Sequence, residues 1–264
     1  DRPWDKILTV HPTDVLDSYT SKGLYCSYDL IQKFFIPLFK TKDIDIDITM
    51  KQYYEITNIH ISIFTVSVNN VESVEISHKT HPDMEIIRAL SMSCAIPVIF
   101  KPVLYNDNYY CDGGIINNFP ITNCIDYVKN QQTEDSQSET TEDLHDIILG
   151  IIHSKFINRD VTLNEDDTIF KYMYSLLYKF VSKIKVDYYR EIEMVKKTFP
   201  FIISFAHDIS DLERFQNIIY KKERLELIHK GETLATDFLH KKYSAKDSAK
   251  DSAKDSAKDS AKDS

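Results

Sequence analysis

The sequence ALSMSCAIPVIFKPVLYNDNYYCDGGIINNFP, residues 89–120, is the stretch that decides the fold. It begins in a helical apolar pattern that ends near Ser91, and the Ile-Pro pair at residues 96–97 interrupts the helix. Further on, Asp112-Gly113-Gly114 puts a carboxylate directly before two glycines. Glycine accepts a positive φ, so we expect a sharp turn that leaves the carboxylate facing a neighbouring group. Alone, however, Asp-Gly is common in hairpin turns and is then purely structural.

The surrounding residues give this motif its meaning, because the whole stretch resembles the patatin-like phospholipases. In that family a helix ending in Ala-x-x-x-Ser-x-x-Ile-Pro-like residues precedes an extended x-Phe-x-Pro-Val piece. A hairpin then delivers Asp-Gly-Gly or Asp-Gly-Ala, followed by x-x-Asn-x-Pro. The residues that keep this order and spacing are Ala89, Ser93, Ala95, Pro97, Phe100, Pro102, Asp112, Gly113, Gly114, Asn118 and Pro120. The resemblance covers residues 22–125 firmly and residues 147–239 loosely.

The resemblance implies a fold and a chemistry. The expected fold is a three-layer α/β/α domain with a central, mostly parallel sheet, truncated on its N-terminal side. The expected activity is lipid acyl hydrolysis by a Ser-Asp dyad, in which Asp112 is the general base and no histidine takes part. A carboxylate at hydrogen-bonding distance can accept a hydroxyl proton. Gly113 and Gly114 would form the turn, Asn118 would fix it, and no metal or organic cofactor is expected.

The sequence does not contain the nucleophile that this dyad requires. In the family the serine lies in a Gly-x-Ser-x-Gly turn, and a glycine-rich loop forms the oxyanion hole. None of the five glycines flanks a serine at that spacing. We therefore expect that the front of the domain is missing and that this chain alone is inactive, whereas the parent protein hydrolyses phospholipids or neutral lipids. Ser91 and Ser93 precede Asp112 but match a structural helix end in the family.

Two other classes of function remain open. The chain could be a degenerate, non-catalytic member of the family that binds a lipid or a protein partner. It could also be a purely structural α/β domain. The sequence upstream of Asp1 distinguishes the enzyme from the binding module, since only the enzyme needs the missing serine turn.

Composition sets the domain organisation that we predict. With 264 residues, 42% of them hydrophobic, the chain can bury a core of ordinary size. We expect a partial patatin-like domain over residues 1–243, interrupted by a polar surface loop at 130–143. Residues 244–264 repeat Ser-Ala-Lys-Asp and hold no apolar side chain larger than alanine, so we expect a disordered tail.

Charge and cysteine content exclude several partners and compartments. The net charge of −9 gives no electrostatic reason to bind nucleic acid. The four cysteines show no Cys-x-x-Cys spacing, which indicates reduced thiols. No apolar stretch approaches the roughly 20 residues needed to span a bilayer. We expect an intracellular protein, cytoplasmic or peripheral at membranes, whose substrate is a phospholipid or another acyl lipid.

Apolar spacing and turn residues predict alternating helices and strands. Ser27 can cap a first helix, Thr49 and Gln52 form a capping box, and Pro82 can begin a later helix. The continuous apolar run at 147–152 indicates a strand buried on both faces. The predicted strands are 59–68, 71–76, 147–152 and 201–205, and the later helices are 169–184, 211–220 and 223–239.

No metal site is predicted. Asp43, Asp45 and Asp47 imitate the start of a calcium loop, but Ile48 stands where the turn glycine is required. His78 and His81 have ligand-like spacing without a third ligand, and are interpreted as surface or capping histidines.

Overall fold

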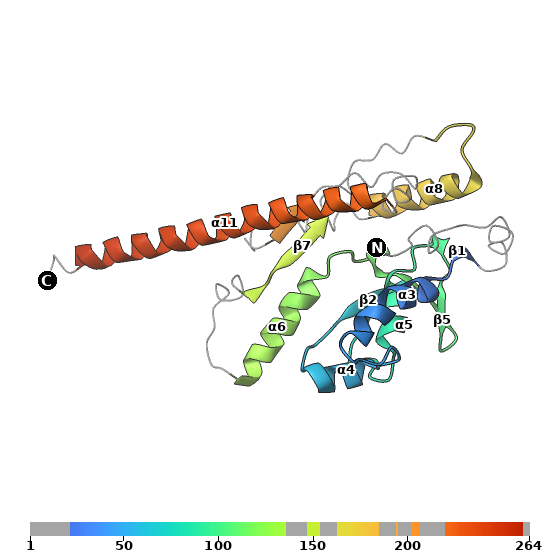
Figure 1. Ribbon diagram of the computed structural model, residues 1–264, viewed down its shortest axis with the longest axis horizontal. Helices are drawn as coiled ribbons and strands as arrows, with labels where there is room; N and C mark the ends of the chain where they lie inside the picture. The colour runs from blue at the N-terminus through green and yellow to red at the C-terminus, as the bar shows by residue number, and fades with distance from the viewer. Residues whose placement is uncertain are drawn as a thin grey trace. The chain divides into compact units, whose positions relative to one another are not determined.

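The computed structural model describes residues 22–135, 147–153, 163–184, 194, 202–205 and 220–260 (Figure 1). The chain divides into two compact units. The first contains Asp1–Pro120 and Asp160–Asp187, and the second contains Ile121–Arg159 and Tyr188–Ser264. The domain boundary expected after residue 243 stays a prediction.

The first unit contains four α-helices and six strands among its described residues. Its helices are α3 (Ser27–Lys40), α4 (Met50–Thr57), α5 (Ile86–Ser93) and α8 (Ile169–Ile184), with a 3₁₀ turn, η1 (Gly113–Ile115). Its strands are β1 (Gly23–Tyr25), β2 (Ile63–Ser67), β3 (Glu72–Ile76), β4 (Val98–Phe100), β5 (Val103–Tyr105) and β6 (Asn108–Asp112). The α/β class predicted from the sequence is thereby confirmed.

The largest sheet has the order β3-β2-β6-β5 and is antiparallel throughout. The central, mostly parallel sheet that we expected is therefore not what the described residues show. Parallel pairing is found in β1 with β4 and, in the second unit, between two further strands. The connections at 68–71 and 106–107 are too short for the crossover of about a dozen residues that parallel neighbours need. The three-layer arrangement stays a prediction.

The core of the first unit lies between α5 and one face of this sheet. Eight buried residues form it: Ile48, Met50, Ile63, Ile76, Met84, Ile86, Ala89 and Met92. Most come from residues 84–92 or from the β2–β3 hairpin, so the core brings α5 against β2, the strand that pairs with β6. This packing positions the strand that ends in Asp112.

Helix α3 begins differently from our expectation. Cys26, not Ser27, occupies the N-cap position, and its side chain makes no capping hydrogen bond. Ser27 is buried inside the first turn. The helix contains Pro37, which has no backbone N–H to donate, and ends at Lys40.

Helix α4 begins at the predicted capping box. The Thr49 hydroxyl accepts a hydrogen bond from the Gln52 backbone N–H at 3.2 Å, and the Gln52 side chain accepts one from the Thr49 N–H at 3.0 Å. The later helix does not begin at Pro82, which is a correction. The backbone carbonyl groups of Pro82 and Met84 instead accept hydrogen bonds from the first N–H groups of α4, and helix α5 starts only at Ile86.

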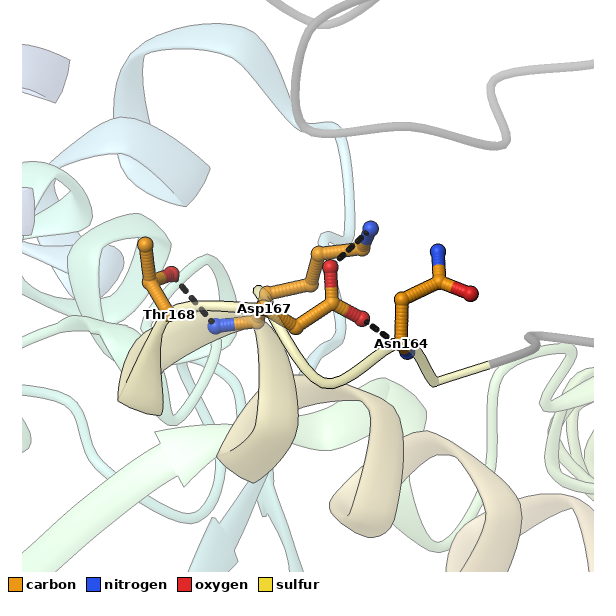
Figure 2. Close-up of polar contacts among 4 residues, drawn as sticks. Asn164, Asp167 and Thr168 are labelled. Atoms are coloured by element: carbon orange, nitrogen blue, oxygen red, sulfur yellow. Dashed lines mark hydrogen bonds and ion pairs between the residues drawn. The ribbon is translucent and has the colours of Figure 1, made fainter.

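Helix α8 has the predicted bounds, and its first turn shows why it begins there. Thr168 is the N-cap, and its hydroxyl accepts a hydrogen bond from the Lys171 N–H at 3.3 Å. The Asp167 carboxylate accepts hydrogen bonds from the Asn164 N–H at 2.8 Å and from Lys171 Nζ at 2.6 Å (Figure 2). These bonds lower the pKa of Asp167, the lysine contributing most. The negative charge of Asp167 also interacts favourably with the positive N-terminal end of the helix dipole.

The second unit has four described elements: α6 (Ile121–Asp135), β7 (Gly150–His153), β8 (Ile202–Phe205) and α11 (Lys221–Ser260). Strands β7 and β8, which overlap two of the predicted strands, pair in parallel. The expectation that residues 147–152 are buried on both faces is wrong. Exposed and buried side chains alternate there, so one face is covered and the other is open.

Helix α11 is the longest helix in the described part of the chain (Figure 1). It continues through the Ser-Ala-Lys-Asp repeat as far as Ser260, where we had expected a disordered tail. Alanine and lysine are good helix formers, and extending an existing helix avoids the cost of nucleation. The predicted helix at 211–220 lies outside the described residues except for Tyr220. None of the described helices is both long and apolar enough to cross a membrane.

Candidate active site

Asp112 is the last residue of β6 and the N-cap of η1. It lies opposite Thr65 in the neighbouring strand β2. Its backbone N–H donates a hydrogen bond to the Ala95 carbonyl at 3.0 Å, which joins the strand end to the segment after α5. The backbone of Asp112 is therefore fixed by two separate parts of the fold.

A tight hairpin delivers this strand. Asn106 and Asp107 connect β5 to β6, and both have positive φ values, 47° and 60°. Two consecutive residues with positive φ are typical of a type I′ turn, for which Asn and Asp are favoured. The predicted hairpin before Asp-Gly-Gly is thus present in the structure.

The Asp112 carboxylate is held by the turn that follows it. Its Oδ1 atom accepts a hydrogen bond from the Gly114 backbone N–H at 2.6 Å. The side chain is half-buried. Hydrogen bonds from Ile116 and Asn117 N–H groups to the Gly113 carbonyl, at 3.2 and 3.0 Å, close the turn.

Neither glycine has a positive φ, which corrects our prediction, and the backbone of a neighbouring strand leaves no space for a side chain at Gly113. No described glycine has a positive φ. A Cβ atom on Gly113 would collide with the backbone of Phe64 in β2. A Cβ on Gly114 would lie 2.6 Å from the Asn118 Oδ1 atom and 2.8 Å from Asp112 Oδ1. The predicted site residues Asp112, Gly113, Gly114 and Asn118 are therefore neighbours in space.

Two cysteine thiols near Asp112 were not predicted. Burial, followed by the charge of Asp112, raises the pKa of Cys111 to about 11. The same two causes raise the pKa of Cys94, a residue of the segment after α5. Both thiols stay protonated at neutral pH and are poor nucleophiles. Nothing in the sequence placed Cys94 beside Asp112, because a contact across about twenty residues leaves no local signal.

The serines that precede Asp112 do not form a dyad with it in the described structure. The Ser91 hydroxyl is buried and donates a hydrogen bond to the Ile87 carbonyl at 2.6 Å. Such a bond to the preceding turn is an ordinary role of serine within a helix. Ser93 is the last residue of α5, as the resemblance implied.

The other patterns considered in the sequence do not gather into a site. The Asp45 carboxylate accepts a hydrogen bond from the Asp47 N–H at 3.2 Å, as in a local turn. Within the described ranges no group of three or more His, Cys, Asp and Glu side chains could hold a metal ion. His81 lies beside the Thr80 hydroxyl, 3.0 Å from it.

Two comparisons relate the sequence to known proteins. Residues 10–125 match the family model of the patatin-like phospholipases. The chain is also 33% identical, over 136 residues, to "Probable lipid hydrolase 463L" of Invertebrate iridescent virus 6. That match covers 50% of this chain and 47% of the viral protein, so the chain spans about half the length of its curated relative. Residues 10–125, which include Asp112 and both glycines, are therefore similar to the patatin-like phospholipases.

Proposed function

We propose that the protein is a lipid acyl hydrolase in which Asp112 is the general base of a Ser-Asp dyad. The observation that supports this most directly is the geometry of Asp112 at the end of β6. Its backbone is fixed by Ala95 and one carboxylate oxygen by the Gly114 N–H, at 3.0 and 2.6 Å. A carboxylate oriented in this way is prepared to accept a proton from a hydroxyl group brought within hydrogen-bonding distance.

The proposed reaction takes place in two steps. The serine hydroxyl attacks the ester carbonyl, its proton passes to Asp112, and the alcohol leaves with that proton while an acyl-serine forms. Water then attacks the acyl-serine and gives a proton to the Asp112 carboxylate, which passes it to the serine oxygen as the acyl–oxygen bond breaks and the fatty acid leaves. The substrate would be a phospholipid or a neutral lipid, reached by peripheral contact with a membrane. The reaction needs no metal or organic cofactor.

The nucleophile is the part of this mechanism that the 264 residues do not supply. Their sequence contains no Gly-x-Ser-x-Gly. We therefore propose that the serine comes from sequence outside these residues and that the chain alone has negligible activity. Only a polypeptide that carries both parts would turn over an acyl ester.

A chromogenic acyl-ester assay tests both statements. It compares residues 1–264 with a version extended by the native upstream sequence. The short chain is expected to give no turnover, and Asp112→Asn is expected to lower turnover of the extended protein about 10²–10⁴-fold, the usual contribution of a general base. Asp107→Asn in the hairpin turn is the matched control, since asparagine also accepts its positive φ.

Two results would contradict the proposal. If the short chain turned over ester and Asp112→Asn abolished this, the serine would lie within residues 1–264. If Asp112→Asn left the extended protein fully active, Asp112 would not be the base.

A non-catalytic module that binds a lipid or a protein partner is the second candidate, and it would apply if the upstream sequence also contained no Gly-x-Ser-x-Gly. An extended protein that shows no turnover but sediments with phosphatidylcholine vesicles would support this function. Loss of binding in Asp112→Asn, without loss of folding, would assign the binding site to the same turn.

A further inference from the structure

Two histidines that are distant in sequence meet beside the β2–β3 hairpin. His60 lies in the loop before β2, and His78 follows β3. The antiparallel pairing of Ile63 with Ile76 places these flanking segments next to each other. The Nδ1 atoms of the two imidazole rings are 3.1 Å apart. Neither residue has a part in the proposed hydrolysis.

The surroundings of the pair hold both rings. The His60 Nε2 atom is 2.8 Å from the Ser62 hydroxyl, which donates its proton to Glu75 Oε1 at 2.6 Å. The His78 ring stacks on Tyr54, with centroids 3.8 Å apart and planes inclined by 2°. The pair is therefore oriented on one side by a serine and a carboxylate, and on the other by an aromatic ring.

These contacts decide where the protons are. Because Ser62 gives its single proton to Glu75, His60 must donate from Nε2, and its Nδ1 then carries a lone pair. A histidine whose second nitrogen is tied through a hydrogen bond to a carboxylate is the usual arrangement of a metal-binding imidazole. Here the Ser62 hydroxyl lies between the two groups, accepting a hydrogen bond from His60 Nε2 and donating one to Glu75.

We propose that the Nδ1 atoms of His60 and His78 together bind a divalent late transition-metal ion such as Zn²⁺. Two nitrogen ligands at 2.0–2.1 Å from zinc in a tetrahedral site lie roughly 3.3 Å apart. The observed separation is 3.1 Å. Without metal, the Nδ1 proton of His78 lies between the two nitrogens. When the metal takes its place, this proton moves to the Nε2 atom of His78, so no net proton is released.

Water completes the coordination. Since no group of three or more ligand side chains gathers in the part of the chain that the structure describes, the site has two protein ligands and open positions. Imidazole suits zinc, copper and nickel, and metal binding requires neutral rings.

Calorimetric titration of the full chain with ZnCl₂ tests the proposal. The wild-type protein is expected to bind one Zn²⁺ ion at the His60–His78 pair, with higher affinity than a single histidine elsewhere in the chain has. His60→Ala and His78→Ala should each remove that step, and the double variant should lose nothing more, because chelation needs both rings. His81→Ala, three residues from His78, is the matched control and should bind like wild type.

Ser62→Ala tests the orienting hydrogen bond. It leaves both ligands in place but removes the link to Glu75, and such changes lower metal affinity about 10–100-fold. A purely structural role of Ser62 would change the unfolding free energy without this change in affinity.

The proposal is overturned if the double variant binds Zn²⁺ as the wild type does, or if His81→Ala loses the step equally. Circular dichroism of each variant must match the wild type for this comparison. If a variant does not fold, the test is anomalous diffraction from crystals of the wild-type protein soaked in ZnCl₂. An anomalous peak at about 2.0–2.1 Å from both Nδ1 atoms supports the site, and its absence refutes it.

Discussion

The glycine at position 113 illustrates how one residue constrains the candidate active site. Its backbone passes so close to Phe64 in β2 that a Cβ atom would collide with main-chain atoms. Main-chain atoms of a paired strand cannot move alone. We predict that Gly113→Ala lowers the free energy of unfolding by about 1–3 kcal/mol, as overpacking does in other cores. Urea unfolding measures this change.

Gly231 provides the control for this prediction. It lies within α11, and a Cβ there would meet nothing within 4 Å. Gly231→Ala should therefore raise stability by about 0.5–1 kcal/mol, since alanine costs less backbone entropy in a helix. Equal effects of the two substitutions would show that close contact with Phe64 does not matter.

The histidine pair predicts a pH dependence of stability in chelator-treated protein. Burial lowers the pKa of His60 and His78 below the ordinary value of 6.5. The charges of His78 and Lys79 lower the pKa of His60 further, and Glu75 opposes them. Below pH 6.5 the unfolded chain therefore takes up protons before the folded chain, so stability falls as the pH is lowered.

Urea unfolding at pH 7.5 and pH 5.5 measures this effect. The wild type should lose more stability between these pH values than the variant with both His60→Gln and His78→Gln. Glutamine retains polar atoms but does not titrate, so the other ionisable groups cancel in the comparison. The same loss in both proteins would mean that the two rings titrate normally.

At the scale of single elements, β7 shows how exposure decides the effect of a substitution. Ile152 is buried, with 6% of its surface exposed, whereas its neighbour Ile151 is 59% exposed. We predict that Ile152→Ala costs about 2–5 kcal/mol, because it removes buried methyl groups and leaves a cavity. Ile151→Ala should change stability by no more than about 0.5 kcal/mol. Guanidinium unfolding of the two variants checks this, and similar costs would contradict the one-sided burial of β7.

The sequence predicts elements well where their signals are local. Thr49 and Gln52 are three residues apart, and both capping bonds can be foreseen from that spacing alone. The error at Pro82 has a different origin. The carbonyl groups of Pro82 and Met84 accept hydrogen bonds from α4, more than thirty residues earlier. A pairing at that distance overrides the local preference for a helix start, and apolar spacing cannot reveal it.

The same distinction applies to the candidate site. The position of Asp112 at a strand end, before a turn, follows from residues 106–114 alone. The reason why glycines stand at 113 and 114 does not follow from these residues alone. Phe64 belongs to another strand, and Asn118 lies beyond the turn. The mostly parallel sheet was inferred from the resemblance, whereas the short connections at 68–71 and 106–107 already favour antiparallel neighbours.

At the scale of the whole molecule, α11 raises the question of what its C-terminal half contributes. The half-buried side chains among its described residues are Arg224, Leu227, Leu234 and Phe238. They recur at helical spacing and therefore form one face. The repeat at 244–260 continues the helix but has no apolar side chain larger than alanine. Its backbone is helical, yet it can bury almost no apolar surface.

We therefore predict that a chain ending at Tyr243 unfolds at the same urea concentration as the full chain. Its helical circular dichroism per molecule should nevertheless be lower, because helical residues have been removed. Leu234→Ala is the control and should shift the midpoint to lower urea, since it removes part of the half-buried face. A lower midpoint for the shortened chain would show that the repeat packs against the protein. An unchanged helical signal would show that the repeat is not helical in solution, as its composition alone first indicated.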